Sequence, residues 1–325
     1  MIKNYFLFLS LLFFICCADN SVIPYELADD WPRLPNDFIL GNPTGIGVSS
    51  VNDIVVFHRG SRVWQTPMPI EKIKEKTILI LDNKTGKIKN AWGSDLFIMP
   101  HGLEVDSEDN IWVTDVALHQ VFKFSYTGEL LMVLGVPNEP GNDSLHFSLP
   151  TDVAVSPNGS FYVSDGYGNS RVVRFSKEGN YLFEWGKFGA DKGAFNIPHG
   201  LDLDKDGNVY VADRENNRIQ KFDSLGGFIN LWQNKSIGQL YSVNIDNDEN
   251  YLLGIDYVVD ENLVPVGSDI FRFNLNLKLN TRFGRSGFYK GQRKRYHDIQ
   301  VDKNGNIYAA DILDNSVQKF IAVKK

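Results

Sequence analysis

Copies of one short segment recur along the chain, and this internal repeat constrains the fold more than any other feature of the sequence. The close copies are MPHGLEVDSEDNIWVTD from Met99, IPHGLDLDKDGNVYVAD from Ile197 and RYHDIQVDKNGNIYAAD from Arg295. Looser copies begin at Asn42, Leu149 and Leu240. The chain therefore contains six similar units in one phase, which is the pattern of a repeat architecture rather than of an isolated hairpin.

Each unit reads as a series of short antiparallel strands. An alternating segment such as GLEVD is followed by a turn rich in Asp, Asn and Gly, and then by a second apolar run such as NIWVTD, which together form a hairpin signature. Most units continue into a third run, for example HQVFKF, and several into a fourth, for example YLFEWG at Tyr181–Gly186. Four strands per unit of roughly 45–50 residues are typical of a propeller blade. We therefore predict an all-β, six-bladed β-propeller that occupies residues 25–325 as one domain.

The last unit stops at what would be its third strand, so its outer strand has to come from elsewhere. The segment from about Tyr25 to Gly41 precedes the first unit. We expect this segment to supply the missing outer strand of the sixth blade and so to close the ring.

Composition agrees with a large folded domain and excludes some partners. The chain has 325 residues, of which 43% are hydrophobic and 22% charged, and it contains 22 Phe, 13 Tyr and 6 Trp, which favours a β-rich interior. The net charge of −7 and the pI near 5.4 argue against a nucleic-acid or anionic-membrane partner. We expect a monomer.

Residues 1–17 have the layout of an export signal. Lys3 precedes the apolar run Phe6–Ile15, which is short for a membrane span. Cys16 and Cys17 follow it directly, as in a bacterial lipoprotein signal in which one of them becomes the lipidated first residue; plain cleavage is the alternative. Both readings predict export to the periplasm, the medium or a lipid anchor at the cell envelope. No other cysteine exists, so we expect no disulfide bond in the mature domain.

One position of the repeat holds a histidine in every second unit, at His101, His199 and His297. The first strand of each blade lines the central channel, and alternate blades place equivalent positions about 120° apart. The three imidazoles should therefore converge on the axis and leave a fourth position open, as in a catalytic zinc site. The alternative is a structural histidine copied by duplication. The other units carry small side chains at this position, by our alignment Thr44, Thr151 and Ser242.

Three polar side chains follow second strands and should reach the same rim as the histidines. They are Arg59 in FHRG, Tyr167 in SDGYGN and Arg214 in ADREN. Two guanidinium groups beside a metal suit a small anionic substrate, because arginine binds a carboxylate with two parallel hydrogen bonds. The phenol can transfer a proton if nearby positive charge lowers its pKa.

Two further groups of polar residues are expected to be structural. A carboxylate ends the second strand in five units and should accept backbone N–H bonds in the following loop: Asp115, Asp165, Asp213, Asp256 and Asp311. His58 occupies this place in the first unit. His119 and His146 fall outside the repeat position of the other histidines, so we assign them no role in the site.

Several segments resemble the peptidyl-α-hydroxyglycine α-amidating lyases, the lyase half of the peptide-amidating monooxygenases, whose repeats are of the NHL type. The segments are FHRGSRVW at Phe57–Trp64, PHGLEVD and WVTDVALHQVFKF within Pro100–Phe124, PTDVAV and VSDGYGNSR within Pro150–Arg171, and ADRENNRIQ at Ala212–Gln220. The resemblance runs from about Ile46 to Phe320. It implies cleavage of the C–N bond of a C-terminal α-hydroxyglycine, with release of an amide and glyoxylate.

The resemblance also implies roles for individual residues. His101, His199 and His297 would hold zinc, and Tyr167 would act as the base on the substrate hydroxyl. Arg59 and Arg214 would bind the substrate and tune the tyrosine. A calcium ion in the channel would be bound by Asp298 and by the backbone carbonyls of Ile46 and Leu103.

The chain departs from the animal members of this family in three respects. Ser148 and Gly168 stand at two of their cysteine positions. Arg295-Tyr296 replaces the methionine-proline that precedes the third histidine, which bears on the substrate. The copper monooxygenase half is absent from this sequence, so a separate protein or another source has to supply the α-hydroxyglycine substrate.

Two other functions are compatible with a propeller of this kind. A metal-dependent propeller hydrolase of the lactonase kind usually has a carboxylate-rich calcium centre, whereas this position is rich in histidine. A non-catalytic NHL scaffold would not explain why His, Arg and Tyr side chains converge on one rim.

Overall fold

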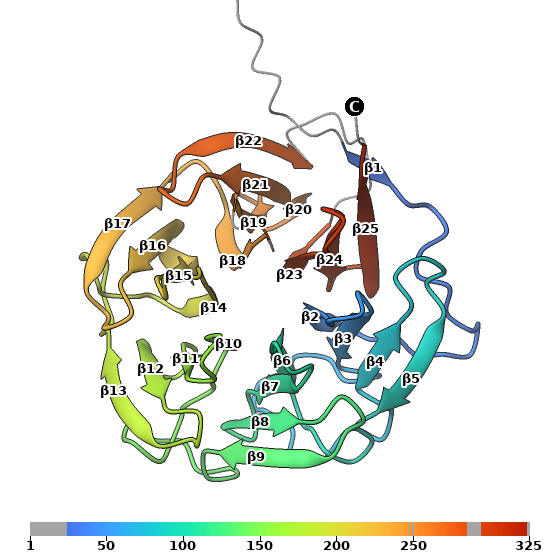
Figure 1. Cartoon of the computed structure of the whole chain (residues 1–325), viewed down its shortest axis with the longest axis horizontal. Helices are drawn as coiled ribbons and strands as arrows, with labels where there is room; N and C mark the ends of the chain where they lie inside the picture. The colour runs from blue at the N-terminus through green and yellow to red at the C-terminus, as the bar shows by residue number, and fades with distance from the viewer. Residues whose placement is uncertain (1–24, 247, 249, 285–293, 324–325) are drawn as a thin grey trace, which may run out of the picture.

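Six antiparallel sheets, five with four strands and one with five, surround a central axis, and each sheet is one blade of a β-propeller (Figure 1). The computed structural model describes residues 25–246, 248, 250–284 and 294–323. The predicted six-bladed, all-β fold is confirmed. Within the described ranges the one helical element is a short 3₁₀ helix, η1 (Arg214–Asn216). These ranges contain no helix long and apolar enough to cross a membrane.

The strands of blades one to three follow one another along the chain. Blade one contains β2 (Pro43–Val48), β3 (Ile54–His58), β4 (Ile78–Leu81) and β5 (Ile88–Trp92). Blade two contains β6 (Pro100–Val105), β7 (Ile111–Asp115), β8 (Gln120–Phe124) and β9 (Leu130–Leu134). Blade three contains β10 (Asp152–Val155), β11 (Phe161–Asp165), β12 (Arg171–Phe175) and β13 (Tyr181–Trp185).

Blade four keeps this order, whereas blades five and six depart from it slightly. Blade four contains β14 (Pro198–Leu203), β15 (Val209–Asp213), β16 (Arg218–Phe222) and β17 (Phe228–Gln233). Blade five contains β18 (Gln239–Ile245), β19 (Leu252–Val259), β21 (Asp269–Phe273) and β22 (Leu279–Gly284), with the short β20 (Pro265–Gly267) paired to β19. Blade six contains β23 (Tyr296–Val301), β24 (Ile307–Asp311), β25 (Ser316–Ala322) and β1 (Tyr25–Leu27).

The N-terminal strand β1 closes the ring, as expected from the incomplete sixth repeat. It pairs with β25 in the register Tyr25 to Ala322 and Leu27 to Phe320, and the two strands lie side by side in Figure 1. The Tyr25 ring stacks on Phe283 of blade five at 5.2 Å between ring centroids. The N-terminal strand therefore joins the last blade by backbone pairing and by apolar contact.

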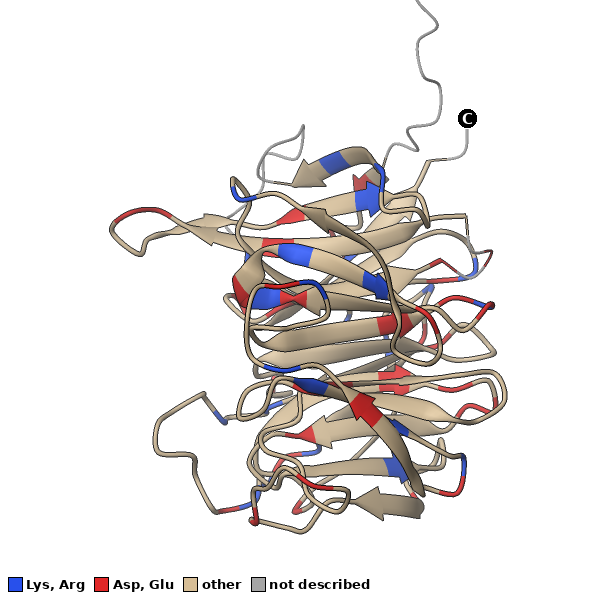
Figure 2. Ribbon diagram, turned by 90° about the vertical axis from the view of Figure 1, so that its left-hand side faces the viewer, with Lys and Arg blue, Asp and Glu red and all other residues tan. Residues whose placement is uncertain are grey.

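The hydrophobic core is divided among the interfaces between blades. Strand β3 is buried along its whole length, whereas the outer strand β13 alternates between exposed and half-buried residues. At one interface Val55 and Phe57 of blade one pack in a cluster with Leu103 and Val113 of blade two. Each interface has such a cluster, so every blade depends on both of its neighbours. Seen from the side, charged residues of both signs are spread along the ring (Figure 2).

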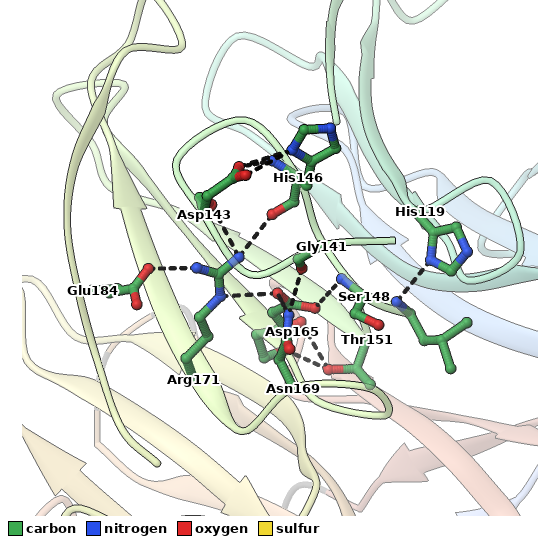
Figure 3. Close-up of polar contacts among 12 residues, drawn as sticks. His119, Gly141, Asp143, His146, Ser148, Thr151, Asp165, Asn169, Arg171 and Glu184 are labelled. Carbon is green, nitrogen blue, oxygen red and sulfur yellow. Dashed lines mark hydrogen bonds and ion pairs between the residues drawn. The ribbon is translucent and has the colours of Figure 1, made fainter. Parts of the chain in front are cut away.

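The aspartates that end the second strands organise the loops beside them. Asp165 accepts hydrogen bonds from Ser148 N at 2.9 Å, Asn169 Nδ2 at 2.7 Å and Arg171 Nε at 3.0 Å (Figure 3). In blade four Asp213 accepts from Asn196 N at 2.7 Å and Arg218 Nε at 2.7 Å. These contacts confirm the structural role expected for the repeated aspartate.

The predicted export signal, residues 1–17, and both cysteines lie outside the described residues. Their assignment stays a prediction.

Replacing Asp213 with Ala should destabilise the domain, because it removes a buried partner of Arg218; both side chains are at most 3% exposed. Removing one member of a buried ion pair typically costs about 3–5 kcal/mol. We expect a loss of that order in the free energy of unfolding, measured by urea denaturation. Glu139, which is exposed, provides the control, and its replacement with Ala should change stability by less than about 0.5 kcal/mol. Equal stabilities of the two variants would contradict the assigned role.

Candidate metal centre and rim

The inner strands carry a bulge at the repeat position that holds the histidines. The register of the first two strands shifts between Pro43 and Gly45 in blade one, between Pro100 and Leu103 in blade two, and at the matching points of blades four, five and six. A bulge turns one side chain away from the regular alternation of the strand. The residue within the bulge therefore belongs to the channel.

The bulge corrects the sequence alignment of blade five. Its register shift lies between Leu240 and Ser242, so Tyr241 occupies the position equivalent to the histidines. Ser242 is instead equivalent to Asp298, which follows His297. The expectation that blade five carries a small side chain at this position was therefore wrong.

The three repeat histidines converge as predicted. His101, His199 and His297 each offer a ring nitrogen, and these nitrogens all lie within 4.8 Å of one another. Their ring centroids are 4.6–4.9 Å apart, and each side chain is at most 4% exposed. Within the described residues, no other group of three or more His, Cys, Asp or Glu side chains lies close enough to hold a metal ion.

Each imidazole is oriented by a hydrogen bond to the next blade. The Nδ1 atom of His101 donates to Thr151 O at 2.6 Å, that of His199 to Tyr241 O at 2.6 Å, and that of His297 to Thr44 O at 2.8 Å. A carbonyl oxygen only accepts, so Nδ1 carries the proton and the lone pair is on Nε2. The even-numbered blades supply the imidazoles, and the odd-numbered blades supply the carbonyl groups that orient them.

The protonation state of the three histidines suits metal binding. Burial lowers the pKa of each imidazole well below its usual value, and repulsion by neighbouring cationic groups lowers it further. These groups are Arg59 for His101, the other two imidazoles for His199, and His101 followed by Arg59 for His297. The rings are therefore neutral at neutral pH. Neutral imidazoles, held through Nδ1 by backbone carbonyls, form the ligand set and the outer support that a divalent metal requires.

The glycine that follows two of the histidines allows the inner strands to approach closely. A Cβ atom at Gly102 would lie 2.5 Å from Asp152 Oδ1 and 2.6 Å from Thr151 O. At Gly200 it would lie 2.9 Å from Tyr241 O. Thr151 O and Tyr241 O are the acceptors that orient His101 and His199, so a side chain at either glycine would displace them.

The phenol of Tyr167 lies against the histidines, as the sequence predicted. Its Oη atom is 3.0 Å from His101 Nε2 and 3.1 Å from His199 Nε2. Arg214, at the start of η1, donates from Nη1 to the same oxygen at 3.2 Å. Tyr167 and Arg214 approach from blades three and four, immediately after β11 and β15.

The pKa of Tyr167 is set by two opposing effects. Burial raises it above the ordinary value, and this effect outweighs the lowering by Arg214 and Arg59. The two arginines by themselves therefore do not make the phenol more acidic than an ordinary tyrosine. A further positive charge is needed to favour the phenolate.

Arg59 reaches the same site from blade one, but it does not contact Tyr167 by a hydrogen bond. Its Nε atom donates to Pro100 O at 3.0 Å, and its guanidinium carbon lies 5.3 Å from the centre of the Trp64 ring. Burial lowers its pKa to about 10, so it stays a cation at neutral pH. Trp64 in turn contacts Tyr167, with 5.2 Å between ring centroids.

A cavity of about 290 Å³ joins these residues on one rim of the channel. The expected residues that line it are Arg59, Tyr167, Arg214 and His297. Arg295, which the resemblance already connected with the substrate, also lines it, together with four residues that the sequence did not point to, namely Asn42, Trp64, Tyr241 and Ile312. Tyr241 could have been identified by aligning the repeat of blade five on its second strand instead of on its first.

Asp298 lies beside Ile46 within the channel, but it meets the N–H group rather than the carbonyl. Its Oδ2 atom accepts from Ile46 N at 2.7 Å, and its Oδ1 accepts from Ser242 Oγ at 2.7 Å. Burial raises the pKa of Asp298 to about 6. Leu103 packs against Gly45, the residue before Ile46.

The remaining histidines lie outside this group. His119 accepts from Leu149 N at 3.0 Å and His146 contacts Asp143 (Figure 3). His58 accepts from Gly60 N at 3.1 Å, so it organises its own turn, much as the aspartates do in other blades.

Comparison with known proteins agrees with the repeat architecture. The NHL repeat family matches residues 97–124, 147–175 and 195–222. A solved structure titled streptogramin B lyase superposes with a TM-score of 0.57 at 16% identity, covering 91% of this chain and 97% of that one. At that identity the likeness concerns the fold alone.

Two sequence relatives identify the family. The chain is 36% identical to peptidyl-glycine alpha-amidating monooxygenase B of Xenopus laevis over 93% of its own length, but it spans only 36% of that protein. It is also 36% identical to a probable peptidyl-alpha-hydroxyglycine alpha-amidating lyase of Caenorhabditis elegans, over 66% of this chain and 67% of that protein. The chain therefore belongs to the family of the peptidyl-α-hydroxyglycine α-amidating lyases.

Proposed function

We propose that the protein is a zinc-dependent lyase that cleaves the C–N bond of a peptidyl- or N-acyl-α-hydroxyglycine and releases an amide and glyoxylate. The observation that carries this proposal is the position of Tyr167 Oη, which lies 3.0 Å and 3.1 Å from two imidazole Nε2 atoms and 3.2 Å from Arg214 Nη1. A proton-transfer group therefore touches both the candidate metal ligands and a cation. The chain covers about a third of the length of the longer relative, and a monooxygenase or another source would supply the α-hydroxyglycine substrate.

His101, His199 and His297 would hold the metal through Nε2. Three neutral imidazoles with one open position favour Zn²⁺. When bound, zinc supplies a Lewis acid for the substrate hydroxyl oxygen and positive charge that favours the phenolate of Tyr167.

The reaction needs one base and returns one proton. Tyr167 takes the proton from the hydroxyl group, the C–O bond gains double-bond character, and the C–N bond breaks with its electron pair moving to the amide nitrogen. Tyr167 can then return the proton to that nitrogen, which balances the atoms. Arg214 holds the phenol through Nη1 and is itself held by Glu215, whose Oε1 accepts from Arg214 Nε at 2.9 Å.

Arg59 is suited to hold the substrate carboxylate. It is 3% exposed and lines the cavity together with Tyr167 and His297. Within the described residues its guanidinium has no carboxylate at ion-pair distance, and its nearest protein acceptor is Pro100 O. A buried cation without a carboxylate partner is costly, so an anionic ligand would stabilise it.

We also propose calcium in the channel near Asp298. The N–H and C=O groups of one residue in an antiparallel strand face the same side, so the carbonyl of Ile46 faces Asp298 together with its N–H. Burial, and then mutual repulsion among carboxyl groups, raises the pKa of Glu104 and Asp152 well above the usual range. Asp202 and Asp298 are among the causes, and a cation in the channel would relieve this repulsion. Leu103 O remains the third predicted ligand.

The export signal makes an envelope or extracellular location part of the proposal. The substrate would then be a small or peptide-borne α-hydroxyglycine compound outside the cytoplasm, and the enzyme would act on it as a monomer.

Purified protein should contain about one zinc ion per chain, because the triad offers three ligands and one open position. Replacing His199 with Ala should remove most of this zinc, measured by elemental analysis. His146→Ala, which changes a histidine outside the triad, should keep it. Full zinc content in His199→Ala would rule out the axial metal centre.

Replacing Tyr167 with Phe should lower kcat by roughly 10²-fold or more, since the general base is lost, while zinc content stays unchanged. Glyoxylate release from α-hydroxyhippurate is the measurement. Tyr181→Phe, a change on the outer strand β13, is the control and should leave kcat unaltered. Turnover of Tyr167→Phe at the level of the unmodified enzyme would exclude the proposed mechanism.

Replacing Arg59 with Ala should act mainly on KM. A guanidinium that binds the carboxylate equally in the ground state and the transition state lowers KM without changing kcat. We expect KM for α-hydroxyhippurate to rise by about 10- to 100-fold. A fall in kcat at unchanged KM would instead assign Arg59 to the chemical step.

A further inference from the structure

We propose that the substrate carries a second carboxylate, at the far end of its acyl group, and that Arg295 binds it. The proposed substrate class is a short N-acyl-α-hydroxyglycine whose acyl chain ends in a carboxylate. This inference rests on the proposed lyase function, and it adds a specificity-determining residue to that site.

Arg295 presents a guanidinium group to the cavity without a carboxylate partner. Its side chain lines the cavity, and its Nη2 atom donates to Tyr241 Oη at 2.6 Å. Within the described residues, no protein acceptor contacts Nη1, and Nε is buried without a partner. The neighbouring residues 285–293, which are not described, contain neither Asp nor Glu in their sequence.

Two aromatic rings fix the orientation of this guanidinium. Its central carbon lies 5.5 Å from the centre of the Tyr241 ring and 4.7 Å from that of Tyr257. Stacking of this kind favours a planar cation and reduces its freedom. Tyr241 is held in turn by the bulge of β18, and its carbonyl orients His199. The guanidinium is therefore preorganised and does not simply extend into solvent.

Arg295 and Arg59 approach the cavity from opposite sides. Arg59 contacts Pro100 of blade two, whereas Arg295 contacts Tyr241 and Tyr257 of blade five. Blades two and five face each other across a six-fold ring. One carboxylate held by Arg59 beside the metal centre would thus leave Arg295 to a different anionic group.

The charges of the cavity support the same conclusion. Of its three arginines, Arg214 is paired with Glu215 at 2.8 Å. Arg59 and Arg295 have no such partner among the described residues, and they interact unfavourably, since the charge of Arg295 helps to lower the pKa of Arg59 after the larger effect of burial. A monoanionic α-hydroxyglycine would balance one of these two cations, and a dianionic one would balance both.

The size of the cavity limits the acyl chain. The cavity has a volume of about 290 Å³, which is at the small end of the range for ligand sites. It would therefore hold both carboxylates only of a compact molecule with a short acyl chain. An N-succinyl group has a terminal carboxylate two methylene groups from the amide, and the N-succinamoyl group has nearly the same shape without the charge. These two groups form a matched pair of probes.

The test measures binding and turnover separately. Calorimetry with N-succinylglycine and N-succinamoylglycine, which lack the reactive hydroxyl, measures binding to the zinc-loaded protein. Glyoxylate release from N-succinyl- and N-succinamoyl-α-hydroxyglycine measures turnover. Arg295→Met removes the charge with a side chain of similar length, and Arg282→Met is the matched control, since Arg282 is exposed and does not line the cavity.

We expect the unmodified protein and Arg282→Met to prefer the succinyl compound by about 10- to 100-fold in both measurements. Arg295→Met should lose this preference, so that within this variant the succinyl and succinamoyl compounds bind and react equally well. A preference in binding without glyoxylate release from either compound would support the Arg295 subsite and overturn the lyase reaction. Glyoxylate release without a preference would overturn the subsite alone. If Arg295→Met weakened the binding and turnover of both compounds by the same factor, the subsite would also be overturned. Arg295 would then contact the α-hydroxyglycine carboxylate that both compounds share.

Discussion

Closure of the ring is the constraint on which the rest of this structure depends. Six blades meet around one axis because β1 joins β25 and Tyr25 stacks against Phe283 of blade five. The core is divided among the interfaces between blades, so each blade is stable only between two neighbours. The six-fold arrangement then converts a repeat along the chain into a three-fold arrangement of side chains around the axis.

Alternate blades supply different groups to the channel. Even-numbered blades provide His101, His199 and His297, and odd-numbered blades provide the backbone carbonyls that accept from them. Because a backbone group fixes each imidazole, the three candidate metal ligands are oriented without a carboxylate in their outer support. The bulges of the inner strands, and the glycines that let these strands approach, therefore matter as much to the centre as the histidines.

The rim above this centre concentrates positive charge in a small, partly enclosed space. Arg214 is neutralised by Glu215, whereas Arg59 and Arg295 keep their charge without a protein carboxylate among the described residues. Burial nevertheless raises the pKa of Tyr167, which shows that desolvation outweighs these cations at the phenol. The two cations without a carboxylate partner are the basis on which we propose an anionic substrate, and a phenolate at Tyr167 would require further positive charge.

The sequence by itself determined the propeller, the number of blades, the source of the closing strand and the convergence of the three histidines, because all of these follow from a repeat whose phase is visible in the residues. The tertiary structure decided which residue of blade five enters the channel. A bulge shifts the register by one residue, so Tyr241 and not Ser242 fills that position. It also decided that Arg295 is held by Tyr241 and Tyr257 and that burial governs the pKa of Tyr167, since both depend on distances between blades that the order of residues along the chain does not contain.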